Sequence, residues 1–228
     1  MEKKPYDISR MFSVIRKSIQ GFPPAMLFQL RDERYDSAFE QLVACVLSIR
    51  TRDEISLQVA HQIFRKARTP FHFQRFSVSE LGEMIKPCTF PFQKAESLLR
   101  ISKLVIEKFS GQTPCNYEEL TSLPGIGPKC ANLILGVACR IPSIGVDIHV
   151  HRIANRWGYV SESTPEKTMK ALEDKLPRSK WIEINELLVP FGKHICTGTL
   201  PKCSTCPVLS YCHQVGVKKM TREALLSP

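Results

Sequence analysis

The chain has 228 residues, of which 43% are hydrophobic, and a formal net charge of +10. A chain of this length can bury one large core or two smaller ones. It contains no apolar run near the ~20 residues of a membrane span, and Met1-Glu2-Lys3-Lys4 leads into no apolar signal region. We therefore expect an intracellular protein without a membrane segment, cytoplasmic if bacterial. The basic charge favours a polyanionic partner, although ordinary solubility would also explain it.

Apolar residues recur at three- and four-residue spacing along most of the chain, which predicts an all-α protein. No stretch alternates apolar and polar residues for long enough to predict a sheet. Oxygen-bearing side chains mark several helix starts, and the expected caps are Asp36, Asp53, Thr164 and Asn116, the last in a capping box with Glu119. The predicted helices span 8–20, 37–49, 54–67, 79–85, 94–109, 117–123, 128–140, 148–157, 165–176 and 180–188.

The segment LPGIGPK at 123–129 lies between two predicted helices. Its glycines permit a tight turn with positive φ angles, and proline suits the first position of a helix. A helix that begins after such a hairpin directs N–H groups and a positive end outward, where a DNA phosphate can bind without sequence being read. Leu123, Gly125 and Gly127 are therefore candidate DNA-binding residues. A plain helix-turn-helix corner is the alternative interpretation.

Lys129 falls in the first turn of the helix that follows this hairpin, at the flank of its apolar stripe, so its amine can reach the rim of a cleft. The positive helix end disfavours an ammonium and so favours a nucleophilic amine. A solvated lysine that contacts phosphate is the alternative.

Asp147 precedes the predicted helix 148–157, where an N-cap is the ordinary role of an aspartate. The same carboxylate would also serve as a base or stabilise an oxocarbenium ion. His149 and His151 lie two residues apart on this helix and cannot face the same cleft, so each is interpreted as structural or as contacting phosphate.

Four of the nine cysteines form a C-x6-C-x2-C-x5-C run at 196–212. Four thiolates suit an iron–sulfur cluster, and they also suit a tetrahedral zinc ion. Structural zinc sites usually have two tight C-x2-C pairs, and this run has one, so the spacing favours a cluster over zinc. Disulfides rank below both, and an odd total argues against a disulfide framework. The run consists of Cys196, Cys203, Cys206 and Cys212, and the scattered cysteines are Cys45, Cys88, Cys115, Cys130 and Cys139.

The hairpin LPGIGPKCAN, the segment VDIHVHRIANR and the cysteine run together resemble the endonuclease III family of helix-hairpin-helix DNA glycosylases. The resemblance runs from about Phe39 to Cys212, and it implies a two-lobed all-α fold with DNA in the groove between the lobes. One lobe would be a helical barrel at 34–141 with the helix-hairpin-helix at about 117–140. The other would be a discontinuous iron–sulfur domain from 1–33 and 142–228, with its cluster loop at 196–212. We expect a monomer.

The resemblance also implies an activity. Lys129 matches the family's catalytic lysine, Asp147 its catalytic aspartate, and the cysteine run the ligands of a [4Fe-4S] cluster, which displaces the zinc interpretation. Family members flip a damaged pyrimidine out of double-stranded DNA, and the lysine attacks C1′ to release the base. The Schiff base that results permits β-elimination 3′ to the abasic site. We therefore expect a bifunctional DNA glycosylase and abasic-site lyase of base excision repair that removes oxidised pyrimidines.

Two positions depart from the family pattern. Arg50 stands where the family usually has a glutamine that fills the space left by the flipped base, and Phe90 stands where it has a wedge leucine. Phe90 would wedge between base steps or pack on the core. A same-fold glycosylase for mismatched or alkylated bases is therefore one alternative, and a non-catalytic iron–sulfur DNA-binding protein is another. His149 is a further DNA-binding candidate, and the basic residues expected on the DNA backbone are Lys193, Lys202, Lys218 and Lys219.

Overall fold

The structure is a computed structural model that describes residues 3–217, so Lys218 and Lys219 lie outside the described residues. It divides the chain into two compact units. The hairpin unit comprises Pro23–Gly145 and Leu176–Glu186, and the cysteine unit comprises the described parts of Met1–Phe22, Val146–Lys175 and Leu187–Pro228. Every regular element of the described chain is helical, which confirms the all-α prediction. The lobe boundaries predicted at 34 and 141 stay a prediction.

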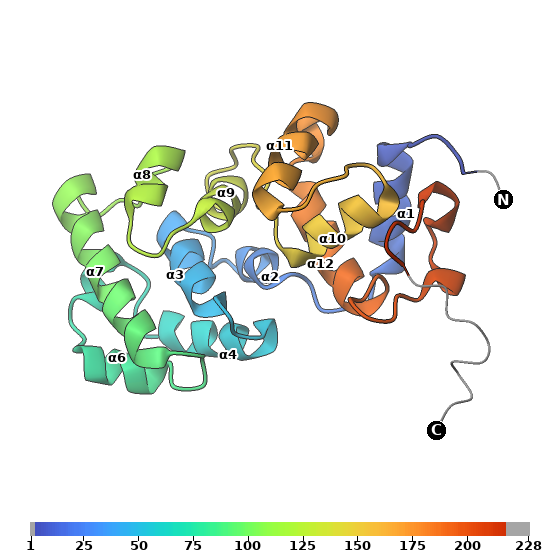
Figure 1. Cartoon of the computed structure of the whole chain (residues 1–228). Helices are drawn as coiled ribbons and strands as arrows, with labels where there is room; N and C mark the ends of the chain where they lie inside the picture. Colours follow the sequence, from blue (N-terminus) through green and yellow to red (C-terminus); the bar gives the residue numbers. More distant parts are fainter. Residues whose placement is uncertain (1–2, 218–228) are drawn as a thin grey trace, which may run out of the picture. The chain divides into compact units, whose positions relative to one another are not determined.

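The hairpin unit is built around helix α3 (Ala38–Ser48), of whose 11 residues the nine from Phe39 to Leu47 are buried. A helix whose residues are buried on all sides must be covered by other elements on all sides. Four helices pack against α3 (Figure 1), namely α2 (Met26–Asp32), α4 (Asp53–Phe64), α7 (Pro91–Phe109) and α9 (Pro128–Val137). The core of this unit therefore lies around α3.

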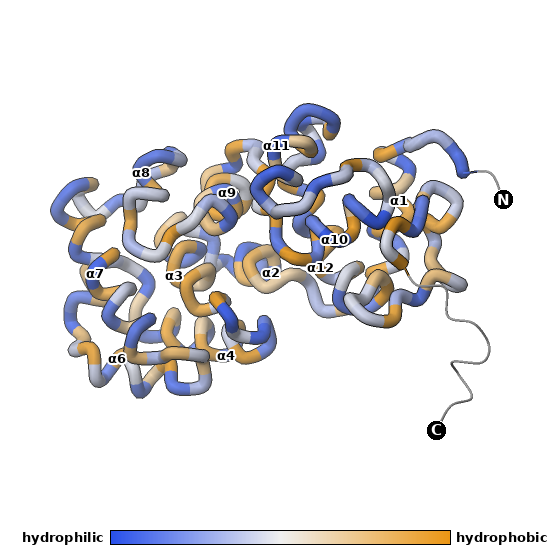
Figure 2. The backbone as a smooth tube through the Cα atoms, viewed as in Figure 1, coloured by the Kyte–Doolittle hydropathy of each residue, from blue (hydrophilic) through white to orange (hydrophobic). Residues whose placement is uncertain are grey.

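The remaining helices of the hairpin unit are short and cover its edges. Helices α5 (Pro70–Phe73) and α6 (Val78–Met84) pack on α7, and α8 (Tyr117–Ser122) packs on α9. Hydrophobic and hydrophilic residues alternate along α7 (Figure 2), as expected for a helix with one buried face. A 3₁₀ turn, η1 (Arg178–Lys180), belongs to the same unit.

The cysteine unit joins the two ends of the described chain. Its helices are α1 (Ile8–Ser18), α10 (Ile148–Trp157) and α11 (Pro165–Lys175), followed by the 3₁₀ turns η2 (Cys203–Thr205) and η3 (Leu209–Tyr211). The Tyr6 hydroxyl donates to Trp157 O at 2.7 Å, and Lys4 N donates to Ser210 O at 2.9 Å. These bonds hold the N-terminal segment against α10 and η3 (Figure 1).

Helix α12 (Glu183–His194) begins in the hairpin unit and continues into the cysteine unit from Leu187 onward, with Pro190 inside it. The sequence prediction ended this helix at residue 188. No helix of the described chain is long and apolar enough to span a membrane.

Every helix predicted from the sequence is present, but two short helices, α2 and α5, were missed, because seven and four residues are too few to show a helical period. Two predicted caps are wrong. Ser37 rather than Asp36 caps α3, in a capping box with Glu40, and Arg52 precedes α4, whose first residue is Asp53. Asn116 and Thr164 do accept bonds from backbone N–H groups, those of Glu119 and Lys167.

Candidate functional site

The hairpin between α8 and α9 is anchored by its apolar residues and open over its glycines. Leu123 and Ile126 are 3% and 4% exposed, and Ile126 N donates to Leu123 O at 3.2 Å. Gly125 has a φ of +78°, a conformation that favours glycine. A Cβ built at Gly125 or Gly127 would meet no described atom within 4 Å. The open space over the hairpin leaves room for a phosphate to approach its backbone N–H groups.

Lys129 is the second residue of α9 and its side chain is exposed, whereas the next residue, Cys130, is buried. The segment after α9 returns across this first turn. A Cβ at Gly145 would lie 2.5 Å from Leu133 Cγ and 3.0 Å from Lys129 O, so only glycine fits there. Asn185 binds both sides of this glycine, because its Oδ1 accepts from Gly145 N and its Nδ2 donates to Gly145 O. The backbone of Lys129 is thus fixed while its side chain is exposed.

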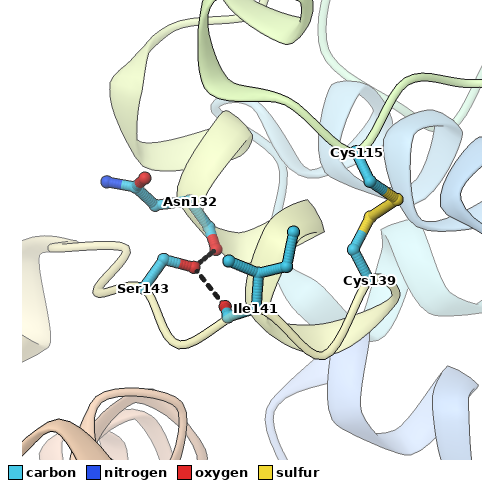
Figure 3. Close-up of a disulfide and its surroundings, with 5 residues drawn as sticks. All are labelled: Cys115, Asn132, Cys139, Ile141 and Ser143. Carbon is cyan, nitrogen blue, oxygen red and sulfur yellow. Dashed lines mark hydrogen bonds between the residues drawn. A yellow bond between two sulfur atoms is a disulfide. The ribbon is translucent and has the colours of Figure 1, made fainter.

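A disulfide joins Cys115, just before α8, to Cys139, just after α9 (Figure 3). The two Cα atoms are 5.8 Å apart, although the residues are separated by 24 positions. The ring that it closes contains α8, the hairpin and α9. Near Cys139, Ser143 Oγ lies 2.8 Å from Asn132 O and 2.9 Å from Ile141 O, which fixes the chain as it leaves α9.

The odd number of cysteines argues against a disulfide framework, and it does not predict this single disulfide between two of the scattered cysteines. The predicted helix 128–140 also included Cys139, but α9 ends at Val137, which leaves Cys139 free to turn toward Cys115. The proximity of the two cysteines arises because the hairpin folds α9 back along α8. Cysteine spacing alone carries no information about that reversal.

Arg50 and Phe90 occupy two loops of the hairpin unit that hydrogen bonds tie together. Arg50 has a φ of +52° and Phe90 a φ of +55°, both are exposed, and the Phe90 side chain is 52% accessible. Thr89 Oγ1 donates to Arg50 O, and Thr89 N donates to Thr51 Oγ1 at 3.1 Å. Both residues therefore have a left-handed backbone, and their exposed side chains lie on two loops that hydrogen bonds join.

Lys94 is a positioning residue that the sequence reasoning missed. It is 6% exposed, and its Nζ donates at 2.8 Å to Leu47 O, Ile49 O and Thr51 Oγ1. Burial lowers the pKa of its amine. The ammonium closes the C-terminal end of α3 and holds the loop that carries Arg50. The sequence did contain a signal for a buried lysine, because Lys94 lies on the apolar stripe of α7 with Ala95 and Leu98.

In the cysteine unit, Asp147 caps α10, as predicted. Its Oδ1 accepts from His149 N at 2.9 Å and from Val150 N at 2.8 Å. The two predicted histidines face different neighbours. The His149 ring lies against Gly192, where a Cβ would come within 2.6 Å of Nδ1, and His151 Nδ1 lies 2.7 Å from Thr168 Oγ1.

Two arginines connect α10 to the first part of the cysteine run. The Arg152 guanidinium donates to Gly192 O and Cys196 O, both at 2.9 Å, and lies 3.1 Å from His149 Nδ1. Arg156 donates to Thr197 O and, at 3.5 Å, to the Cys196 sulfur. The helix that begins at Asp147 therefore also holds the loop of the cysteine run.

The four cysteines of the run line one cavity. Burial, with smaller contributions from the neighbouring thiols, raises the pKa of Cys206 to about 11 and also raises the pKa of Cys212. Four clustered thiols of this kind are a donor set that a cationic iron–sulfur core would stabilise as thiolates. Among the described residues, no group of three or more His, Cys, Asp or Glu side chains is placed to hold a metal ion.

The structure brings the four cysteines together around one cavity and brings the Arg50 and Phe90 loops together. Lys129 belongs to the hairpin unit and Asp147 to the cysteine unit, and their joint role in catalysis stays a prediction. Lys202 is exposed and Lys193 is half-buried. The DNA contacts assigned to the hairpin residues, to Arg50, Phe90 and His149, and to these lysines also stay predictions.

Comparisons with known proteins give consistent results. Residues 43–178 match the HhH-GPD superfamily of base excision DNA repair proteins. Endonuclease III of Thermotoga maritima is 38% identical over 197 residues, which cover 86% of this chain and 89% of that protein. Endonuclease III of Bacillus subtilis is 33% identical over 181 residues, covering 79% and 83%. A solved structure of a trapped endonuclease III–DNA covalent intermediate superposes with a TM-score of 0.79 at 28% identity, covering 91% of this chain and 94% of that one.

The disulfide should stabilise the hairpin unit. Replacing both cysteines (Cys115→Ala with Cys139→Ala) should lower the free energy of unfolding by about 3 kcal/mol, because a ring of this length restricts the unfolded chain by that amount. Denaturant unfolding without reductant measures the change. Cys88→Ala, at another buried cysteine of the same unit, is the matched control. An equal loss in the control, or no loss in the double variant, would contradict the assignment.

Proposed function

Because the chain belongs to the endonuclease III family of HhH-GPD base excision DNA repair proteins, we propose that it removes oxidised pyrimidines from double-stranded DNA and cuts the strand 3′ to the abasic site. As a member of this family, the protein is a DNA glycosylase with abasic-site lyase activity. We further propose that Lys129 is the nucleophile, that Asp147 assists it, and that the enzyme acts as a monomer on intracellular DNA, in the cytoplasm if bacterial.

The position of Lys129 is the observation that carries this proposal. It is exposed on the first turn of α9, directly after a hairpin whose glycines leave open space above the backbone. A phosphate held by the hairpin N–H groups would fix a nucleotide near this turn without reading its sequence. The net charge of +10 supports binding to a polyanion.

The chemistry then follows from a neutral lysine amine. Lys129 Nζ attacks C1′ of the flipped nucleotide, and the bond from C1′ to the base breaks with its electron pair leaving on the base. The sugar ring then opens: the C1′–O4′ bond breaks, O4′ takes up a proton, and Nζ forms a double bond to C1′. The resulting protonated Schiff base makes the proton on C2′ acidic. Its removal allows the C3′–O bond to break by β-elimination, which cuts the strand. Water releases the lysine and restores the enzyme.

Asp147 has a defined orientation for its proposed role. Two backbone N–H groups hold Oδ1, and the carboxylate lies at the N-terminal end of α10. A carboxylate in this position would stabilise the positive charge that develops at C1′, or accept a proton during the steps that follow.

We propose that Cys196, Cys203, Cys206 and Cys212 hold a [4Fe-4S] cluster. All four line the same cavity, and Arg156 donates to the Cys196 sulfur, a hydrogen bond typical of the surroundings of such clusters. When bound, the cluster would supply a structural crosslink of the loop. The arginines of α10 would then connect that loop to the helix that Asp147 caps.

Arg50 and Phe90 support a second candidate, a glycosylase of the same fold that acts on mismatched or alkylated bases. Both side chains are exposed on linked loops with left-handed backbone. An arginine donates but does not accept hydrogen bonds, so it would favour an unpaired base with acceptors on its edge, unlike a glutamine.

Replacing the nucleophile separates catalysis from binding. Lys129→Ala should lose the covalent complex that borohydride traps between the enzyme and abasic DNA, while it still binds the duplex in a gel-shift assay. Lys103→Ala is the matched control, since Lys103 is an exposed lysine of α7 in the same unit, 66% accessible and paired with Glu107. Unchanged trapping by Lys129→Ala would refute the assignment.

The same trapping assay, run on a panel of duplexes, distinguishes the two candidate substrates. Efficient trapping on a duplex that contains thymine glycol supports the first proposal. Weak activity on thymine glycol combined with strong activity on a mismatched or alkylated base supports the second.

Asp147→Asn tests the carboxylate without removing the cap, because asparagine caps helices as well as aspartate does. Base excision should slow by about 10²- to 10⁴-fold, the range for loss of a general acid–base group, with little change in thermal stability. Single-turnover kinetics and thermal unfolding provide the two measurements. A variant that is equally active would leave Asp147 with a capping role alone.

Cys203→Ala tests the cluster ligands. Iron content and thermal stability should fall together, because the loop loses the group that crosslinks it. Cys88→Ala removes a buried cysteine outside the run and should retain iron. A Cys203→Ala protein that is folded, active and free of iron would contradict the structural role.

A further inference from the structure

A second pair of cysteines lies buried in the hairpin unit. Cys45 is the eighth of the 11 residues of α3 and is fully buried, and Cys130 is the third residue of α9 and is 7% exposed. Their sulfur atoms are 2.7 Å apart, less than an ångström more than the ~2.05 Å of a disulfide bond. The helices that carry them pack directly against each other. No large movement is therefore needed to join the two sulfurs.

We propose that Cys45 and Cys130 form an oxidisable pair that closes to a second disulfide in the presence of a peroxide. The site is distinct from the proposed cluster ligands and from the existing disulfide. It does not depend on the proposed function.

The two thiols are not equivalent. The Cys45 thiol donates its hydrogen bond to the Cys130 sulfur. This bond lowers the pKa of Cys130 against the opposing effect of burial, and the charge of Lys129 lowers it further, whereas the same bond and burial raise the pKa of Cys45. Because the thiolate is the reactive form and Cys130 has the greater exposure, Cys130 reacts first and Cys45 resolves the product.

The steps balance with one peroxide molecule. The Cys130 thiolate attacks one peroxide oxygen, the O–O bond breaks, and a sulfenic acid forms while hydroxide leaves and takes up a proton as water. The Cys45 sulfur then attacks the Cys130 sulfur, the S–O bond breaks, and the second oxygen leaves as water. Two thiols lose two electrons to the peroxide, and two water molecules form for each disulfide.

With the new bond in place, both ends of α9 would be joined covalently to other parts of the hairpin unit. Cys139, beyond its C-terminal end, is already joined to Cys115, and Cys130 in its first turn would become joined to the buried helix α3. Lys129 is adjacent to Cys130, so its turn would be fixed to the core by a covalent bond. The ring between Cys45 and Cys130 spans 85 positions, and a long ring restricts the unfolded chain strongly.

Hydrogen peroxide is the probe for the test, applied to the full-length protein as purified. Differential alkylation followed by peptide mapping without reductant should yield a peptide pair joined through Cys45 and Cys130. The midpoint of thermal unfolding should rise by on the order of 10 °C. The Cys115→Ala, Cys139→Ala double variant should show the same crosslink and the same rise, and dithiothreitol should reverse both there, because that variant lacks the other disulfide.

Cys45→Ala and Cys88→Ala are the paired controls. Cys88 is also a buried free cysteine of the hairpin unit. Burial raises the pKa of its thiol, and the neighbours that oppose this effect are Lys94 and Thr51 rather than another thiol. Cys88→Ala should keep the crosslink and the stabilisation, and Cys45→Ala should lose both. Iron content, measured in all samples, separates these effects from damage to the cluster cysteines.

Recovery of Cys45 and Cys130 from peroxide-treated wild-type protein as separate alkylated thiols, or as separate sulfinic acids, would overturn the proposal. So would a stabilisation that persists in Cys45→Ala. The peptide map of the wild-type protein decides the question even if a variant fails to fold.

Discussion

The burial of α3 on every side is the constraint on which the arrangement of the hairpin unit depends. A helix with nine buried residues cannot contact solvent on any face, so α2, α4, α7 and α9 must surround it. Each covering helix thereby receives a fixed position relative to the others. The first turn of α9 carries Lys129, and the C-terminal end of α3 leads into the Arg50 loop. The packing of one helix thus determines where both features lie.

The buried ammonium of Lys94 shows how this core accommodates a charge. Removing a lysine amine from water is unfavourable unless hydrogen bonds compensate for the lost hydration. Leu47 O near the end of α3, and Ile49 O and Thr51 Oγ1 just beyond it, provide that compensation. Lys94 in return supplies a donor to two carbonyl groups at this helix end. These hydrogen bonds of Lys94 join α7 to the end of α3 and hold the Arg50 and Phe90 loops in one arrangement.

Helix α10 has a comparable role in the cysteine unit. Asp147 occupies its N-terminal end, and Arg152 and Arg156 extend from it to carbonyl groups of the cysteine run. Guanidinium groups suit this task because each presents several donors in a rigid plane. Because residue 192 in α12 is glycine, the His149 ring of α10 can lie close to α12. Helix α10 therefore also packs against α12. A change in the cysteine loop would therefore act on the helix that Asp147 caps.

The sequence alone determined the helical class, the hairpin and the cysteine run, because each is a local pattern: a period of three to four residues, two glycines before a proline, and four closely spaced thiols. It also predicted the cap at Asp147, whose two hydrogen bonds reach backbone N–H groups only two and three residues further along the chain. Only the tertiary structure decided that Cys115 pairs with Cys139, that the thiols of Cys45 and Cys130 touch, and that Lys94 closes α3. These contacts join residues from 24 to 85 positions apart, and their proximity follows from how whole helices pack rather than from any local pattern.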